Sequence, residues 1–158
     1  VRRGADFPVA PQPEDRATTW PRLSSKVHGA IDWSWTAAEV ERFICAFDDP
    51  YPGAYTFLRG EQVHLKGCSR GSADPVFHPF QAGLIYRAGS SGLYVACREG
   101  NLHIQRLADV DGRELPYRSL VGDRLWTPAE VLERARQLRV RYTPEGPAAL
   151  EPAVECKP

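Results

Sequence analysis

The sequence lacks several features that would assign it at once to a class of protein. Its 158 residues include no methionine, even at position 1, and this absence favours a fragment of a longer protein. It contains no run of 18 apolar residues and no apolar signal core near its start, so we expect no membrane span and a cytoplasmic location. Its 20 basic and 20 acidic residues cancel. Because no net field attracts phosphates or anionic lipid, we expect neither nucleic acid nor a membrane as a partner.

Motifs for catalysis, metals and nucleotides are also missing. No glycine-rich phosphate loop occurs, and Ser69 lacks the strand–turn–helix setting that a nucleophilic G-x-S-x-G serine needs. The four cysteines form no C-x-x-C pair, and the histidines form no H-x-x-x-H pair. The sequence therefore predicts no catalytic, cofactor-binding or metal-binding residue, and it leaves substrate-binding residues unassigned. The histidines, expected at the surface or hydrogen-bonded in the core, are His28, His64, His78 and His103.

Three smaller groups of residues receive structural interpretations. Asp48 and Asp49 precede Pro50 and are expected to serve a helix end rather than acid–base chemistry. Cys45 and Cys97 lie in apolar surroundings and are expected to be small core residues. A solvated helix face accounts for the arginines near the C-terminus. These are Arg134, Arg136, Arg139 and Arg141.

Proline and glycine, with 14 and 13 residues, divide the chain into three parts. Residues 1–25 are interpreted as an inter-domain linker, because prolines interrupt any helix there. Residues 26–142 are predicted to form one barrel domain. Residues 143–158 are predicted to be a flexible tail.

Two helices are predicted, on either side of a run of strands. Thr36 and Glu39 fit a capping box, and Pro50 must end the helix that follows it. A second helix is predicted over 127–138, with Thr127 as its cap. The first helix carries an apolar stripe that we expect to be core, formed by Val40, Phe43, Ile44 and Phe47.

Five short segments with a period of two are predicted to be strands. Because barrel closure removes exposed edges, close turns between short strands favour a small barrel with Greek-key character. The predicted fold class is therefore mainly β with flanking helices (α+β), with one helix before the barrel and one after. The strands are expected at 54–58, 62–66, 83–87, 92–97 and 102–107.

Trp33 and Trp35 form the most unusual cluster. Two indoles two residues apart could make a stacking platform for a ring. The favoured alternative is that one tryptophan closes the barrel while Asp32 caps a nearby turn.

From Gln12 to Cys68 the sequence resembles the C-terminal domain of methionyl-tRNA formyltransferases and their relatives. The order and spacing of five stretches agree with that domain, and residues 83–107 match more loosely as its barrel strands. The stretches are Ala-Thr-Thr-Trp-Pro-Arg-Leu at 17–23, Ile-Asp-Trp-Ser at 31–34, Ile-Cys-Ala-Phe at 44–47, Pro-Tyr-Pro-Gly-Ala at 50–54 and Leu-Arg-Gly at 58–60.

The resemblance implies an OB-like barrel that accompanies a catalytic domain. In this family an N-terminal Rossmann-like domain binds 10-formyltetrahydrofolate and moves its formyl group to an amine, using an Asn, a His and an Asp. No residue of this chain matches those catalytic positions. The expected partners are therefore that N-terminal domain and a second copy in a homodimer, and the chain itself is expected to be a non-catalytic accessory domain without a cofactor.

The formyl acceptor stays open. A neutral chain with a longer insert at 69–80 and a helix at 127–138 departs from the enzymes that act on initiator tRNA, which favours an amino sugar or another small amine. The alternative is a tRNA-binding C-terminal domain of a methionyl-tRNA formyltransferase. A free-standing structural module is a third hypothesis.

Overall fold

The computed structural model describes residues 13, 15, 23–71, 76–143 and 146–152, and it describes side chains up to Arg141. The predicted linker, 1–25, therefore lies almost wholly outside the described residues. The first described α-helix, α1, spans Ser25–His28. No helix in the described part is long and apolar enough to cross a membrane.

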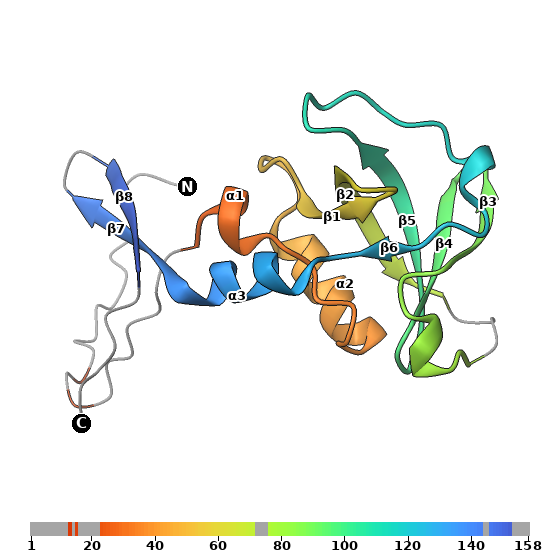
Figure 1. The fold of residues 1–158 in the computed structure, drawn as a ribbon, viewed down its shortest axis with the longest axis horizontal. Coiled ribbons are helices and arrows are strands. Elements are labelled where there is room, and N and C mark those ends of the chain that lie inside the picture. The colour runs from red at the N-terminus through yellow and green to blue at the C-terminus, as the bar shows by residue number, and fades with distance from the viewer. Residues whose placement is uncertain (1–12, 14, 16–22, 72–75, 144–145, 153–158) are drawn as a thin grey trace, which may run out of the picture.

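An antiparallel sheet of six strands, curled into a barrel, forms the body of the domain (Figure 1). The strands lie in the order β3-β4-β5-β2-β1-β6, and the placement of β2 beside β5 gives the Greek-key arrangement. The predicted fold class, mainly β with flanking helices, is confirmed. The strands are β1 (Ala54–Leu58), β2 (Glu61–Arg70), β3 (Ile85–Gly89), β4 (Gly92–Cys97), β5 (Gly100–Ala108) and β6 (Leu125–Trp126).

The five predicted strands are confirmed, but β2 is longer than predicted and β6 was not predicted at all. β1 pairs with β2, and β3 pairs with β4. β2 extends to Arg70 because its last residues pair with Leu102 and His103 of β5, which are distant in sequence. The predicted loop at 69–80 therefore begins later, and it ends in a short 3₁₀ helix, η2 (Pro79–Gln81).

The barrel closes where β6 lies between β1 and the start of β3. The amide of Leu125 donates to the carbonyl of Gly83 over 2.8 Å, and that of Ile85 donates to Asp123 over 2.9 Å. Gly83 has a φ of +83°, and a Cβ there would lie 2.0 Å from the Leu125 carbonyl oxygen. A glycine is therefore required at this junction, both for its backbone conformation and for the close approach.

Helix α2 (Ala37–Ala46) begins and ends as predicted and packs on β2 and β5. The capping box is present, because the Glu39 amide donates to Thr36 Oγ1 and the Thr36 amide donates to Glu39 Oε2. Val40, Ile44 and Phe47 of the predicted stripe are buried. Phe43 is half-buried at the margin of the core, edge-on to Trp35.

The prediction that both cysteines belong to the core is only half right. Cys97 is buried at 1% exposure, on the inner side of β4. Cys45 is exposed. It follows Ile44 by one residue, and one step along an α-helix rotates a side chain by about 100° away from the buried stripe.

The C-terminal part of the chain departs most from prediction. Helix α3 (Ala129–Gln137) begins after Pro128, and Thr127 does not cap it; the Thr127 hydroxyl lies 3.1 Å from Thr56 Oγ1 instead. A hairpin of β7 (Leu138–Thr143) and β8 (Gly146–Pro152) follows, where a flexible tail at 143–158 was predicted; residues 153–158 lie outside the described part. Figure 1 shows this hairpin standing apart from the barrel beyond α3.

The same hairpin corrects the predicted arginine face. Arg134 and Arg136 lie on α3, but Arg139 and Arg141 lie on β7. Both β7 arginines are exposed, and they alternate with less exposed neighbours such as Val140. An alternation with a period of two is that of a strand rather than of a helix.

Replacing Ile44 by Ala should lower the free energy of unfolding by about 2–5 kcal/mol, because the fully buried side chain would leave a cavity between α2 and the barrel. Denaturant unfolding of both proteins measures the change. Cys45→Ala on the exposed side of the same helix is the control and should change stability by no more than about 0.5 kcal/mol. Equal small effects of both substitutions would show that this face of α2 is not packed.

Candidate functional site

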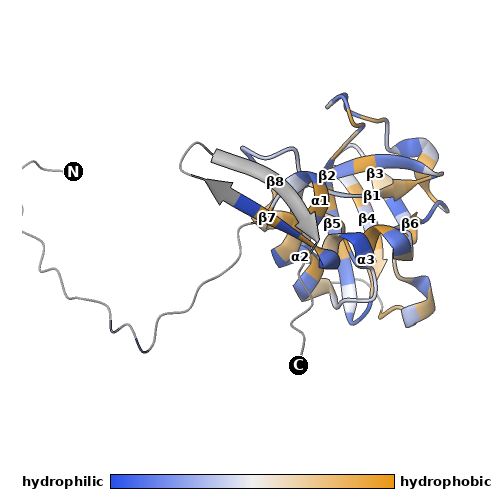
Figure 2. Ribbon diagram, turned by 60° about the vertical axis from the view of Figure 1, so that its left-hand side comes forward, coloured by the Kyte–Doolittle hydropathy of each residue, from blue (hydrophilic) through white to orange (hydrophobic). Residues whose placement is uncertain are grey.

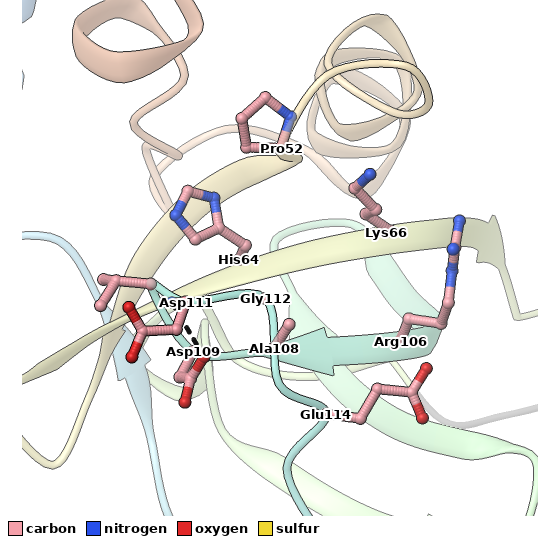
Figure 3. Close-up of a pocket in the computed structure, with 10 residues that line it drawn as sticks. Pro52, His64, Lys66, Arg106, Ala108, Asp109, Asp111, Gly112 and Glu114 are labelled. Carbon is pink, nitrogen blue, oxygen red and sulfur yellow. Dashed lines mark hydrogen bonds between the residues drawn. The ribbon is translucent and has the colours of Figure 1, made fainter.

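A polar cavity of about 360 Å³ lies beside β2 and β5 (Figure 3). Its upper wall is formed by Pro52, His64 and Lys66, and its floor is formed by the end of β5 and the loop after it. Cavities of this size can hold a small ligand. Here, however, cations and carboxylates line the walls together: Lys66 and Arg106 face Asp109, Asp111 and Glu114 across the cavity.

Asp48 and Asp49 neutralise the two cations of this cavity. Asp49 accepts from Lys66 Nζ over 2.6 Å and from Arg106 Nη2 over 2.7 Å. Asp48 accepts from the Gly67 amide over 2.8 Å and lies 3.3 Å from Arg106 Nη2. These carboxylates were predicted only to serve a helix end. They form instead an ion-pair latch, made of Asp48, Asp49, Lys66 and Arg106, that ties the end of α2 to β2 and β5.

The latch changes the pKa of two of its groups, Asp49 and Arg106. The hydrogen bond from Arg106, followed by that from Lys66, lowers the pKa of the Asp49 carboxyl from its ordinary 3.8 to about 2. The same contact with Asp49 raises the pKa of Arg106. Asp49 is therefore a carboxylate at neutral pH, and its lowered pKa suits an ion pair rather than a proton donor.

The acidic side of the cavity is also committed to local structure. Asp109 Oδ1 accepts from the amides of Asp111 and Arg113, both over 2.9 Å, and so folds the turn at 109–113 (Figure 3). Asp111 lies 3.8 Å from Arg113. His64 lies 3.3 Å from the Gly53 carbonyl oxygen. The cavity thus combines paired charges with fixed turns, which gives it little capacity for acid–base chemistry.

Neither Ser69 nor the thiols of Cys68 and Cys97 are activated as nucleophiles. Ser69 lies exposed on β2, next to His103 of β5, rather than on a strand-to-helix turn. Burial raises the pKa of the Cys97 thiol to about 12 and also raises that of Cys68. Neither thiol supplies a thiolate near neutral pH.

The four histidines lie on four separate elements, as expected. His28 on α1 contacts the Leu138 carbonyl oxygen at 2.9 Å, and His78 caps η2. His103 on β5 stacks on Tyr94, with ring centroids 4.6 Å apart. Within the described residues, no three His, Cys, Asp or Glu side chains are grouped so that they could hold a metal ion.

The favoured interpretation of the tryptophan cluster is confirmed. Trp33 is buried, and its Nε1 donates to Thr56 Oγ1 over 2.9 Å. Asp32 Oδ1 accepts from the amide and the hydroxyl of Ser34, and so holds the turn between them. Trp35 packs edge-on against Phe43. The other interpretation, a ring-stacking platform made of both indoles, is therefore wrong.

Three cations without a carboxylate partner lie on α1 and on the C-terminal arm, which is α3 together with the β7–β8 hairpin. Lys26 on α1, Arg134 on α3 and Arg139 on β7 are exposed, and within the described part of the chain none of these three forms an ion pair. His28 holds α1 against the junction of α3 and β7, so the three elements are neighbours. We call Lys26, Arg134 and Arg139 the cationic ledge. Figure 2 shows hydrophilic residues along α3 and β7.

Several cations of the barrel are paired with carboxylates, as in Arg59 with Asp123 at 2.7 Å and Arg70 with Glu41 at 2.8 Å. On the arm, Arg136 contacts the carboxylates of Asp32 and Glu133. A chain with no net charge thus still presents the exposed cations of the ledge to solvent.

Fold and surface together define a small α+β barrel domain with a cationic C-terminal arm. The family model described as "Formyl transferase, C-terminal domain" matches residues 24–124, and the chain belongs to this family. Its relatives include a methionyl-tRNA formyltransferase of Dechloromonas aromatica, 36% identical over 130 residues, with 78% of this chain and 40% of the relative covered.

Two further relatives carry the same name. The protein of Cereibacter sphaeroides is 35% identical over 117 residues, with 73% of this chain and 38% of the relative covered. The protein of Stutzerimonas stutzeri is 34% identical over 111 residues, with 70% and 33% covered. The chain thus spans about two fifths or less of the length of these relatives.

The lowered pKa of Asp49 is testable by carbon-detected NMR titration of its carboxyl group. Because the folded-state pKa lies below the unfolded one, the contribution of the latch to stability is complete above about pH 4 and is lost as the pH falls towards 2. The titration midpoint should lie near 2 in the native chain and move towards 3.8 in Arg106→Gln. Arg113→Gln, outside the latch, should leave it unchanged. A native midpoint near 3.8 would contradict the latch.

Proposed function

We propose that this chain is the C-terminal domain of a methionyl-tRNA formyltransferase and that it helps to hold the tRNA substrate. The observation that carries the proposal is the agreement between the family match over 24–124 and the name that the relatives share. Formyl transfer from 10-formyltetrahydrofolate is assigned to an N-terminal catalytic domain outside this chain, which is the principal partner.

The relatives favour tRNA over an amino sugar as the formyl acceptor. The preference for a small amine rested on the neutral charge of the chain, the insert at 69–80 and the helix at 127–138. The distribution of the charges weakens the first of these arguments. Latched cations in the barrel contribute little to the field outside it, whereas the ledge presents Lys26, Arg134 and Arg139 to solvent. Lysine and arginine side chains of this kind neutralise phosphates and release counterions.

The cationic ledge is therefore the proposed contact for the phosphate backbone of tRNA. Three unpaired cations are few, so the affinity of this chain alone should lie in the range of non-specific binding, with Kd about 10⁻⁶–10⁻⁴ M at physiological salt. An accessory domain needs no higher affinity for tRNA, because a catalytic domain linked to it adds its own contacts and the two bind together.

A titration of labelled initiator tRNA with this chain at several salt concentrations tests the proposal. The double variant Arg134→Ala/Arg139→Ala should reduce the slope of log K against log salt by about 0.9 for each phosphate contact removed on a duplex. The matched control is Arg59→Ala/Arg70→Ala, which removes the same charge from two ion pairs of the barrel.

The control should bind tRNA with nearly the native slope. Equal losses in both double variants would show that only total charge matters and would contradict a contact at the ledge. A native chain without salt-dependent tRNA binding would contradict the proposed function itself.

A further inference from the structure

We infer that a strip of the barrel surface formed by Phe57, Phe80, Arg124 and Trp126 binds unpaired nucleobases of an RNA. The inference rests on the proposed function and extends it from the phosphate backbone to the bases. We call these four residues the aromatic strip.

Strand β6 sets the strip on the outside of the barrel. Leu125 is fully buried, so its neighbours Arg124 and Trp126 point to the opposite, outer face. Trp126 is 50% exposed and pairs with Phe57 of β1 across the ladder. Figure 1 shows β6 crossing the barrel between α3 and β3.

Arg124 lies against one of the two exposed rings of the strip, that of Phe80. Its Nη1 donates to the Phe80 carbonyl oxygen over 2.8 Å, and its Cζ lies 5.1 Å from the centre of the Phe80 ring. Phe80 is 77% exposed. Within the described residues Arg124 has no ion pair with a carboxylate, so its positive charge is available to a phosphate next to the stacked base.

Single exposed apolar residues are common on protein surfaces and need no explanation. This strip differs because the guanidinium of Arg124 lies over the exposed Phe80 ring, and exposed Trp126 shares the outer face of β6 with Arg124. Tyr94, another outward aromatic residue, lies in contact with Arg87 at 3.7 Å and stacks on His103, so its ring is already covered by the protein. The rings of Phe80 and Trp126 keep much of their surface open to a ligand.

Nucleobases fit such a strip better than other ligands do. Every base offers a π-face to an aromatic ring, arginine adds a cation–π contact, and the adjoining phosphate complements the charge. A tRNA has unpaired nucleotides in its loops and at its 3′ end. The strip ends at Trp126, and α3, which carries Arg134 of the ledge, begins three residues later at Ala129.

Fluorescence anisotropy with two RNA probes tests the inference on the whole chain. The probes are a labelled hexa-adenylate single strand and a blunt RNA duplex. Trp126→Ala should weaken binding of the single strand by about 5- to 150-fold, which is the loss of about one stacked base. Binding of the duplex should change less than about twofold, because it depends on phosphates.

Two further variants separate stacking from structural damage. Trp126→Phe keeps an aromatic ring and should retain most of the affinity for the single strand. Tyr51→Ala removes an aromatic residue of similar exposure outside the strip and should have no effect. Native affinity of Trp126→Ala for the single strand would overturn the inference and indicate a protein-binding surface instead.

The result also separates this inference from the proposed function. If Trp126→Ala leaves the affinity for the single strand unchanged while the ledge variants weaken tRNA binding, the inference fails and the proposed function stands. If single-strand binding depends on Trp126 while the ledge variants leave tRNA binding intact, the strip stands and the tRNA contact at the ledge fails.

Discussion

Closure of the barrel at Gly83 is the constraint on which the rest of the structure depends. The backbone of β6 reaches Gly83 at 2.8 Å, a distance that no side chain at position 83 would allow. Because β6 thereby joins β1 to the start of β3, the sheet has no long free edge there. The same contact fixes where the chain leaves the barrel, and so it places α3 and β7 beside α1.

The placement of the arm shows how a neutral chain can carry a local group of exposed cations. On the barrel, Asp48 and Asp49 of the latch neutralise the charges of Lys66 and Arg106. The same ion pairs tie the end of α2 to β2 and β5. On the arm, the ledge keeps its cations in solvent. The domain thus contains charges that tie its elements together and other charges that are exposed to solvent, and the sum of all charges conceals this difference.

Local signals in the sequence predicted local structure well. The capping box of Thr36 and Glu39 and the stripe through Ile44 predicted α2, and alternating segments predicted five of the six barrel strands. The predictions that failed concern contacts between residues distant in sequence. Strand β6 is only two residues long and forms because it pairs with Gly83 and Phe57. The Thr127 hydroxyl contacts that of Thr56 rather than capping α3. The latch, too, joins residues 17 and 57 positions apart. The family was found from its residues. On the formyl acceptor, the net charge favoured a small amine, whereas the names of the relatives favour tRNA.

The central claim is that this domain meets RNA through its arm and the adjoining β6, and not through the cavity of the barrel. Amide hydrogen exchange of the full chain, with and without initiator tRNA, tests it most directly. The account predicts slower exchange with tRNA over 124–141, and unchanged exchange around Asp48, Lys66 and Arg106. Slower exchange around the cavity, with the arm unaffected, would contradict it.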